Sequence, residues 1–341
     1  MNLTELNKVA TAMVAPGRGI LAADESTGTI KKRFDSIGVE STSDSRRDYR
    51  EMLFRSGEAM SKYISGVILY DETIRQTAKD GTPLVKLIDK AGSIPGIKVD
   101  KGTKPLPFCA GEVITEGLDG LRERLVEYRG LGAKFAKWRA VIDIGASMPS
   151  YSCIAANAHA LARYAALCQD ETIVPIVEPE VLMDGDHDID RCVAVTTWIL
   201  RETFQELFYN RVALEGMVLK PNMAVPGKKS AKRASVEEVA EKTARMLKEC
   251  VPAAVPGIAF LSGGQSDEEA TAHLDAINKL GDLPWRVTFS YGRALQASPQ
   301  KAWSGKAENV AAAQRAFNHR AMMNGLATLG QWKVDLERKA A

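Results

Sequence analysis

The sequence predicts an α/β fold, a closed (β/α)8 barrel of the TIM type in which eight strands alternate with helices. Eight short apolar runs recur along the chain at intervals of roughly 30 to 45 residues, each long enough to hold one helix. Helical patterns separate the runs, as in a parallel sheet. The alternative, an open doubly wound sheet, is disfavoured because no Gly-x-Gly-x-x-Gly follows any of the runs.

The expected strands are short runs of branched and small residues. In chain order they cover residues 19–24, 64–70, 94–100, 133–139, 173–180, 214–220, 257–264 and 285–292. The helical patterns between them include residues 120–131, 152–169, 190–209, 236–249 and 266–280. In the last of these, Ser266 and Glu269 have the spacing of a capping box, which marks a helix start.

A single domain over residues 1–341 is expected, because no linker, low-complexity tract or repeat divides the chain. Its three parts would be an N-terminal helix in residues 1–18, the barrel in 19–300, and C-terminal helices with a tail in 301–341. Within the last part, residues 302–329 are alanine-rich and helical in pattern. The polar, charged residues 331–341 are expected to form a mobile tail.

The composition shows no strong charge bias. Of 341 residues, 45% are hydrophobic and 26% are charged, with a net charge of +2, so nothing favours nucleic acid or a membrane as a partner. The amphipathic start lacks the core of a signal peptide, and no apolar run could span a bilayer. The five cysteines include no Cys-x-x-Cys pair, which favours a reducing compartment, the cytoplasm, over a zinc site.

One apolar strand ends on a lysine. Within Leu214–Met223, alternation places Gly216, Val218 and Lys220 on one face, and Pro221 ends the strand. Most such lysines simply point into water. Here, however, further charged residues gather at the carboxyl ends of the other strands, where barrels carry their active sites. They are Asp24, Lys98, Lys137, Arg139, Glu178 and Glu180.

These side chains favour Schiff-base aldol chemistry. Burial and a second cation both disfavour an ammonium ion, and Lys137 is the cation expected beside Lys220. The Lys220 amine would attack a ketone to give a carbinolamine and then an iminium, which is an electron sink. Loss of water needs an acid, which Glu178 or Glu180 could supply. Cleavage of the C–C bond needs a base, a role open to Asp24.

Two loops have the features of a phosphate site. One loop follows the seventh run and the other lies at the end of the eighth. Barrels commonly bind phosphate at these two positions. Hydroxyls, glycine backbone and a guanidinium come together in Ser262, Gly263, Ser290, Gly292 and Arg293. A second anion site could use Lys98 with Ser26, Thr29, Lys32 and Arg33.

Two other motifs favour simpler interpretations. The segment Asp184–Asp188 resembles a metal cluster, but no second histidine is nearby, so a turn leading into the next helix is expected. The basic stretch 228–233 lies on a near-neutral protein and is expected to be a solvated loop that could draw anionic substrate toward the rim.

Seven segments together resemble the class I fructose-bisphosphate aldolases. They are residues 19–28, 96–102, 135–139, 173–180, 219–223, 261–265 and 289–297, in the family's order. The resemblance implies an enzyme with neither metal nor cofactor that reversibly cleaves fructose 1,6-bisphosphate to dihydroxyacetone phosphate and glyceraldehyde 3-phosphate, in glycolysis and gluconeogenesis. It also suggests a homotetramer, although no sequence periodicity indicates an interface.

The resemblance further implies roles for individual residues. Lys220 would form the Schiff base, and Lys137, Glu178 and Asp24 would handle protons and charge. The pocket would be completed by Arg139, Glu180 and Lys98. The C1-phosphate would be held by Ser262, Gly263, Gly292 and Arg293. Toward the other phosphate would lie Ser26, Thr29, Lys32 and Arg33, with threonine at a position where the family often has serine.

The chain departs from the animal and plant members at its end. They finish with a tyrosine that assists proton transfer at the enamine carbon, whereas residues 331–341 contain none. Either another group performs this step or the step is slower. Two alternatives also stay open: a preference for fructose 1-phosphate or sedoheptulose 1,7-bisphosphate, and a scaffold protein that binds filaments or other enzymes. The complete lysine and carboxylate set argues against a purely structural role.

Overall fold

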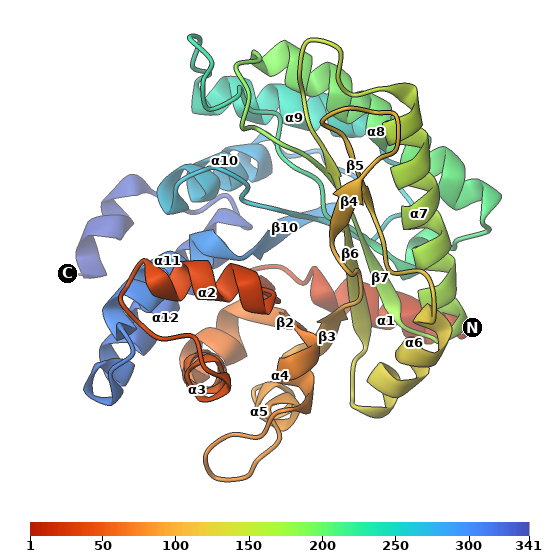
Figure 1. Ribbon diagram of the computed structural model, residues 1–341. Helices are drawn as coiled ribbons and strands as arrows, with labels where there is room; N and C mark the ends of the chain where they lie inside the picture. Colours follow the sequence, from red (N-terminus) through yellow and green to blue (C-terminus); the bar gives the residue numbers. More distant parts are fainter. Residues whose placement is uncertain (341) are drawn as a thin grey trace.

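The computed structural model describes residues 1–340, leaving aside the side chains of Lys339 and Ala340, and contains the predicted closed barrel. Eight parallel strands pair in the order β1-β10-β9-β8-β7-β6-β3-β2 and close on themselves (Figure 1). An open doubly wound sheet is therefore excluded. The barrel strands are β1 (Gly19–Ala23), β2 (Ile64–Leu69), β3 (Ile94–Lys98), β6 (Phe135–Ile142), β7 (Val174–Val181), β8 (Val218–Leu219), β9 (Gly257–Phe260) and β10 (Arg286–Tyr291).

Helices surround the strands, as Figure 1 shows. They are α1 (Leu3–Met13), α2 (Thr27–Asp35), α3 (Ser43–Phe54), α4 (Asp71–Arg75), α5 (Leu84–Lys90), α6 (Leu121–Gly130), α7 (Tyr151–Asp170), α8 (Ile189–Tyr209), α9 (Val236–Cys250), α10 (Asp267–Leu280), α11 (Arg293–Trp303) and α12 (Val310–Ala327), with a π-helical turn η1 (Ala59–Tyr63) before β2. The predicted helices α6 to α9 are confirmed to within one residue at each end. The predicted capping box of Ser266 and Glu269 at the start of α10 is also confirmed, with both of its hydrogen bonds present.

Apolar side chains close the N-terminal end of the barrel. Leu6 and Met13 of α1 are fully buried in a cluster with barrel residues that include Phe135. The ring of Phe135 fills the interior so tightly that a Cβ atom built on Gly96 would lie 2.3 Å from it, so β3 needs a glycine there. Because this end is packed, a polar site can form only toward the carboxyl ends of the strands.

The strand predicted over residues 214–220 is wrong over most of its length. The strand β8 spans only Val218–Leu219, and Leu214–Gly216 forms a 3-10 turn, η2. Gln169 of α7 donates hydrogen bonds to the carbonyl oxygens of Ala213, just before this turn, and of Gly216 within it, and these tertiary contacts fix the turn. Lys220 follows the strand, but its N–H still bonds to β7 at 2.8 Å, so the lysine keeps its predicted place at the strand end.

Two local features were not predicted. An antiparallel pair, β4 (Thr103–Pro105) and β5 (Val113–Thr115), follows β3, and three residues per strand are too few for a recognisable pattern. The helical region 302–329 is interrupted, because Ser304 and Gly305 take φ angles of 46° and 74° and so end α11. A short 3-10 turn, η3 (Ala307–Asn309), then leads into α12.

The prediction of a mobile tail over residues 331–341 is wrong for the part that the structure describes. Residues Val334–Ala340 form a 3-10 helix, η4. The Glu337 carboxylate accepts hydrogen bonds from Arg320 Nη1 at 2.5 Å and from Trp332 Nε1 at 2.9 Å, which ties this segment to α12. Ala341 lies outside the described residues.

Candidate active site

A cavity of about 1250 Å³ opens at the carboxyl ends of the barrel strands. Every residue predicted from the sequence as a catalytic or substrate-binding candidate lines it. The strands and the loops that follow them thus bring together residues that are far apart in the sequence, as the barrel architecture requires. These residues are Asp24, Ser26, Thr29, Lys32, Arg33, Lys98, Lys137, Arg139, Glu178, Glu180, Lys220, Ser262, Gly263, Ser290, Gly292 and Arg293.

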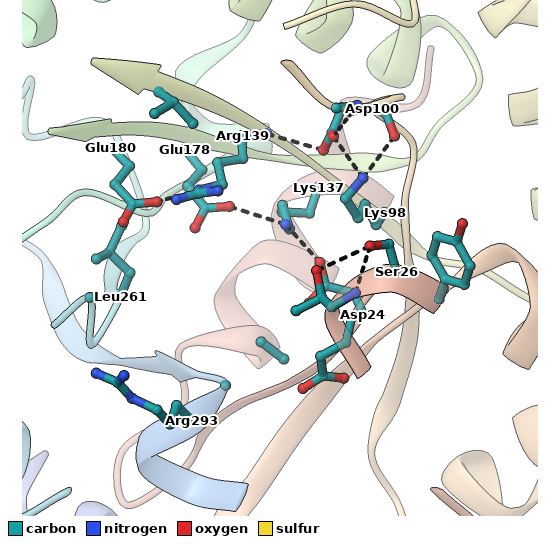
Figure 2. A pocket seen from close by; sticks show the side chains of 18 of the residues that line it. Asp24, Ser26, Lys98, Asp100, Lys137, Arg139, Glu178, Glu180, Leu261 and Arg293 are labelled. Atoms are coloured by element: carbon teal, nitrogen blue, oxygen red, sulfur yellow. Dashed lines mark hydrogen bonds and ion pairs between the residues drawn. The ribbon is translucent and has the colours of Figure 1, made fainter. Parts of the chain in front are cut away.

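Two lysines and two carboxylates form a buried chain of ion pairs at the floor of the cavity. Glu178 lies between the lysines: its Oε1 is 3.0 Å from Lys220 Nζ and its Oε2 is 3.4 Å from Lys137 Nζ. Lys137 Nζ also lies 2.6 Å from Asp24 Oδ2, and Figure 2 shows Lys137 reaching both carboxylates. Two positive and two negative charges balance each other here, which offsets the cost of burying them.

The chain of ion pairs fixes the charge state of two of its members. Burial alone would lower the pKa of Lys137, but the carboxylates of Asp24 and Glu178 outweigh it and raise that pKa above its usual range. Burial alone would raise the pKa of Asp24, but Lys137 and Lys220 outweigh it and lower that pKa to about 2. In the free protein Lys137 is therefore an ammonium ion and Asp24 a carboxylate near neutral pH.

The other predicted catalytic carboxylate has a different neighbour. Glu180 forms an ion pair with Arg139, as Figure 2 shows, and a Cβ atom on Gly263 would lie 2.9 Å from Glu180 Oε1. Of the two glutamates proposed as acids, only Glu178 contacts Lys220. Glu180 thus orients Arg139 next to the loop that follows β9.

Two functional contacts were missed in the sequence. Lys98 Nζ lies 2.7 Å from Asp100 Oδ1, so Asp100 holds this lysine in the pocket wall. Asn222 Oδ1 accepts the N–H of Val181 at 3.0 Å, which pins the segment that follows Lys220 to the end of β7. Both residues lie inside segments that resemble the aldolases, but their partners are set by tertiary packing, which no local pattern reveals.

The two phosphate loops meet at the start of α11. Gly292 precedes the helix, no side chain caps it, and both Gly292 and Arg293 line the cavity, so the helix start is suited to bind an anion. Figure 2 shows Arg293 at this helix start, away from the chain of ion pairs. The hydroxyl of Ser290 is buried without a hydrogen-bond partner among the described residues, and it lies on the same rim as Ser262.

Four residues of the second predicted anion site belong to α2 or cap it. Ser26 caps α2 and its hydroxyl lies 3.1 Å from that of Thr29, with Lys32 one turn further along the cavity wall. Arg33 points elsewhere: its Nη2 lies 3.7 Å from the position that a Cβ atom on Gly292 would occupy. Arg33 thus approaches the start of α11.

A comparison with protein families decides where the chain belongs. The model of the family "Glycolytic: Fructose-bisphosphate aldolase class-I" matches residues 5–341. The chain belongs to the class I fructose-bisphosphate aldolase family. It is thus a lyase that cleaves fructose 1,6-bisphosphate reversibly to dihydroxyacetone phosphate and glyceraldehyde 3-phosphate through a lysine Schiff base, a reaction of glycolysis and gluconeogenesis.

Related aldolases match over nearly the whole chain. A "Probable fructose-bisphosphate aldolase class 1" of Xanthomonas campestris is 58% identical over 98% of this chain and 100% of its own length. The cytosolic fructose-bisphosphate aldolase 4 of Arabidopsis thaliana is 53% identical over 98% of this chain and 85% of its own. A solved structure of the Plasmodium falciparum aldolase, in complex with TRAP and an inhibitor, has a TM-score of 0.94 at 49% identity, covering 97% and 96% of the two chains.

The remaining motifs of this aldolase lie at the rim. Asp188 caps α8, which confirms the turn predicted for residues 184–188, and residues 1–340 contain no group of three potential metal ligands. Lys228 pairs with Asp184 at 2.6 Å at the mouth of the cavity. No helix in the described part of the chain is long and apolar enough to cross a membrane.

Proposed function

We propose that Lys220 is the nucleophile of this aldolase and forms the Schiff base with C2 of fructose 1,6-bisphosphate. The position of Glu178 between the two lysines supports this assignment. Lys137 is held as an ammonium ion by Asp24 as well as Glu178, whereas within residues 1–340 Lys220 has Glu178 as its one carboxylate partner. Lys220 is thus the amine that can pass its proton to a neighbour and attack a ketone.

Glu178 would carry the protons of Schiff-base formation. It accepts a proton as Lys220 becomes a free amine, and it returns this proton to the carbinolamine hydroxyl, which leaves as water. Its contact with Lys220 at 3.0 Å is within reach for both transfers. Lys137 would stay charged throughout, and it would stabilise Glu178 whenever Glu178 is a carboxylate.

Asp24 would act in the cleavage step. The C4 hydroxyl of the sugar loses its proton, the C3–C4 bond breaks, and the electron pair moves into the iminium to give an enamine. Asp24 lies across the cavity floor from Glu178, with Lys137 between them, and is the carboxylate placed to receive that proton. Protonation at C3 and hydrolysis then release dihydroxyacetone phosphate.

The phosphates would occupy opposite walls of the cavity. Ser262, Gly263, Ser290, Gly292 and Arg293 would bind the C1-phosphate at the start of α11. Ser26, Thr29, Lys32 and Lys98 would lie toward the other phosphate. Arg139 and Glu180 would complete the pocket between them. The lining of a single cavity by all of these residues supports this arrangement.

We extend the proposal to the protein's organisation. Residues 1–341 would form one domain, in a cytoplasmic homotetramer whose partners are phosphorylated sugars and not nucleic acid or membranes. No metal or other cofactor would be needed, because the protonated imine supplies the electron sink that a Lewis acid supplies in other aldolases. The balanced charge of the chain supports the choice of small anionic substrates over polyanions.

The variant Lys220→Ala tests the assignment of the nucleophile. We expect turnover of fructose 1,6-bisphosphate to fall by at least about a thousandfold, with the melting temperature retained, because no other amine is bonded to Glu178 in the same way. Lys8→Ala, an exposed lysine of α1 outside the cavity, is the matched control and should keep full activity. Substantial activity in a folded Lys220→Ala protein would contradict the proposal.

A further inference from the structure

A second buried set of charges lies beside the reacting groups and has no part in the bond-making steps. Glu25 follows Asp24 in the chain, and its side chain is only 4% exposed. One of its oxygens, Oε1, accepts hydrogen bonds from Arg33 Nη1 and, at 2.8 Å, from Gln296 Nε2. Arg50 Nη2 donates to the Glu25 carbonyl oxygen at 2.8 Å. Side chains of α2, α3 and α11 therefore hold Glu25 in place.

Arg33 uses its two terminal nitrogens for different purposes. Nη1 bonds to Glu25, whereas Nη2 lies beside Gly292 at the start of α11 and has no hydrogen-bond partner among the described residues. The Arg33 side chain is 25% exposed and lines the cavity. The guanidinium thus extends from a buried carboxylate to the place where an anion would meet the α11 N–H groups.

A purely structural ion pair would not need this geometry. The buried cation that balances the charge of Glu25 is Arg50. Its side chain is 1% exposed, and its Nη2 lies 3.9 Å from Glu25 Oε2. Arg33 lines the cavity, and its Nη2 has no hydrogen-bond partner among the described residues. An arginine fixed at one nitrogen loses less side-chain entropy when the other nitrogen binds phosphate, so the contact adds to affinity.

We propose that Glu25 is a positioning residue for substrate: it holds Arg33 so that Nη2 points at the phosphate bound beside Gly292. Glu25 itself touches neither phosphate nor sugar. The assignment rests on the proposed function, in which this subsite takes the C1-phosphate. It moves Arg33 from the second phosphate to the first and makes Glu25 a determinant of phosphate affinity.

The variant Glu25→Gln removes the charge and keeps the size. We expect KM to rise about tenfold for fructose 1,6-bisphosphate and for fructose 1-phosphate, which share the C1-phosphate, while kcat stays within about twofold. The matched control is Glu72→Gln. Glu72 bonds to Arg46 at 2.8 Å and lies 3.8 Å from Arg50, so it belongs to the same cluster of arginines but does not contact Arg33. Its KM should stay at the wild-type value even if its melting temperature falls.

A double-mutant cycle with Arg33→Ala separates positioning from a loss of stability. If Glu25 acts through Arg33, Glu25→Gln should add almost nothing to KM in the Arg33→Ala background. Additive effects, an unchanged KM in Glu25→Gln, or an equal rise in Glu72→Gln would each overturn the proposal. Borohydride trapping on Lys220 in the same variants is independent of this contact. Lost trapping in the wild-type protein would contradict the proposed function instead.

Discussion

At the scale of single residues, charge balance explains how two lysines can lie at the floor of one cavity. Glu178 contacts both, and Asp24 holds Lys137 alone. The shared carboxylate gives the two amines different surroundings although both are buried. In the proposed mechanism this asymmetry, and not burial by itself, distinguishes the lysine that reacts from the one that stays charged.

Asp24 leads to a prediction about pH. Its pKa is lowered to about 2 in the folded protein, below the ordinary value of 3.8, because Lys137 and Lys220 outweigh the effect of burial. A lowered pKa stabilises the fold fully above about pH 4, and this stabilisation is lost as the pH falls toward 2. Wild type should thus lose about 2 kcal/mol relative to Asp24→Asn across this window.

Urea unfolding at pH 6, 4.5 and 3 measures this difference, of which about 1 kcal/mol should be lost by pH 3. Asp119→Asn, an exposed aspartate outside the cavity, controls for the loss of one carboxylate. A stability difference between wild type and Asp24→Asn that does not change with pH would show that ionisation of Asp24 beside Lys137 does not stabilise the fold.

The residues that could be predicted share one property. Lys137 and Glu178 lie within strand-forming runs and Lys220 directly follows one, so their place in the barrel follows from the strand pattern alone. Asp100 and Glu25 could not be predicted, because each acts through a partner that the fold brings close. The bond of Arg33 to Glu25 and its approach to Gly292 could not be predicted for the same reason.

At the scale of elements, the contact between β7 and the segment after β8 positions Lys220, the proposed nucleophile. β8 has only two residues, too few to hold Lys220 by strand pairing alone. Side-chain hydrogen bonds of Asn222 add to the few backbone hydrogen bonds of β8. Asn222 is 4% exposed, accepts the N–H of Val181 and donates to Thr196 Oγ1 at 3.1 Å. A short strand followed by a buried amide thus replaces the longer strand that the sequence suggested.

Asn222→Ala should therefore affect both stability and rate. Leaving the Val181 N–H and the Thr196 hydroxyl unpaired should cost about 2–3 kcal/mol in the free energy of unfolding. We also expect kcat to fall more than KM rises, because Lys220 is two residues away. Urea unfolding and steady-state kinetics measure the two effects.

Asn278→Ala is the control, since Asn278 donates a single hydrogen bond within α10, to Leu274 O at 2.9 Å. It should lose less stability and keep its kcat. Equal behaviour of the two variants would mean that Asn222 has no special role in placing Lys220.

At the scale of the whole molecule, the barrel separates stability from chemistry. Its N-terminal end is packed with apolar side chains from α1 and the strand interior, and its carboxyl end holds the charged cavity. The count of eight apolar runs was enough to predict this architecture. It could not predict the hairpin of β4 and β5 or the packed 331–338 segment, where the Glu337–Arg320 contact overrides a polar sequence pattern.

The most direct test of the proposed mechanism is borohydride reduction in the presence of dihydroxyacetone phosphate and excess EDTA, followed by peptide mass mapping. We predict one reduced adduct, on Lys220, absent from Lys220→Ala. An adduct on Lys137 or Lys98 would contradict the roles assigned to the two lysines that flank Glu178. A folded wild-type protein that forms no adduct would contradict the Schiff-base mechanism itself.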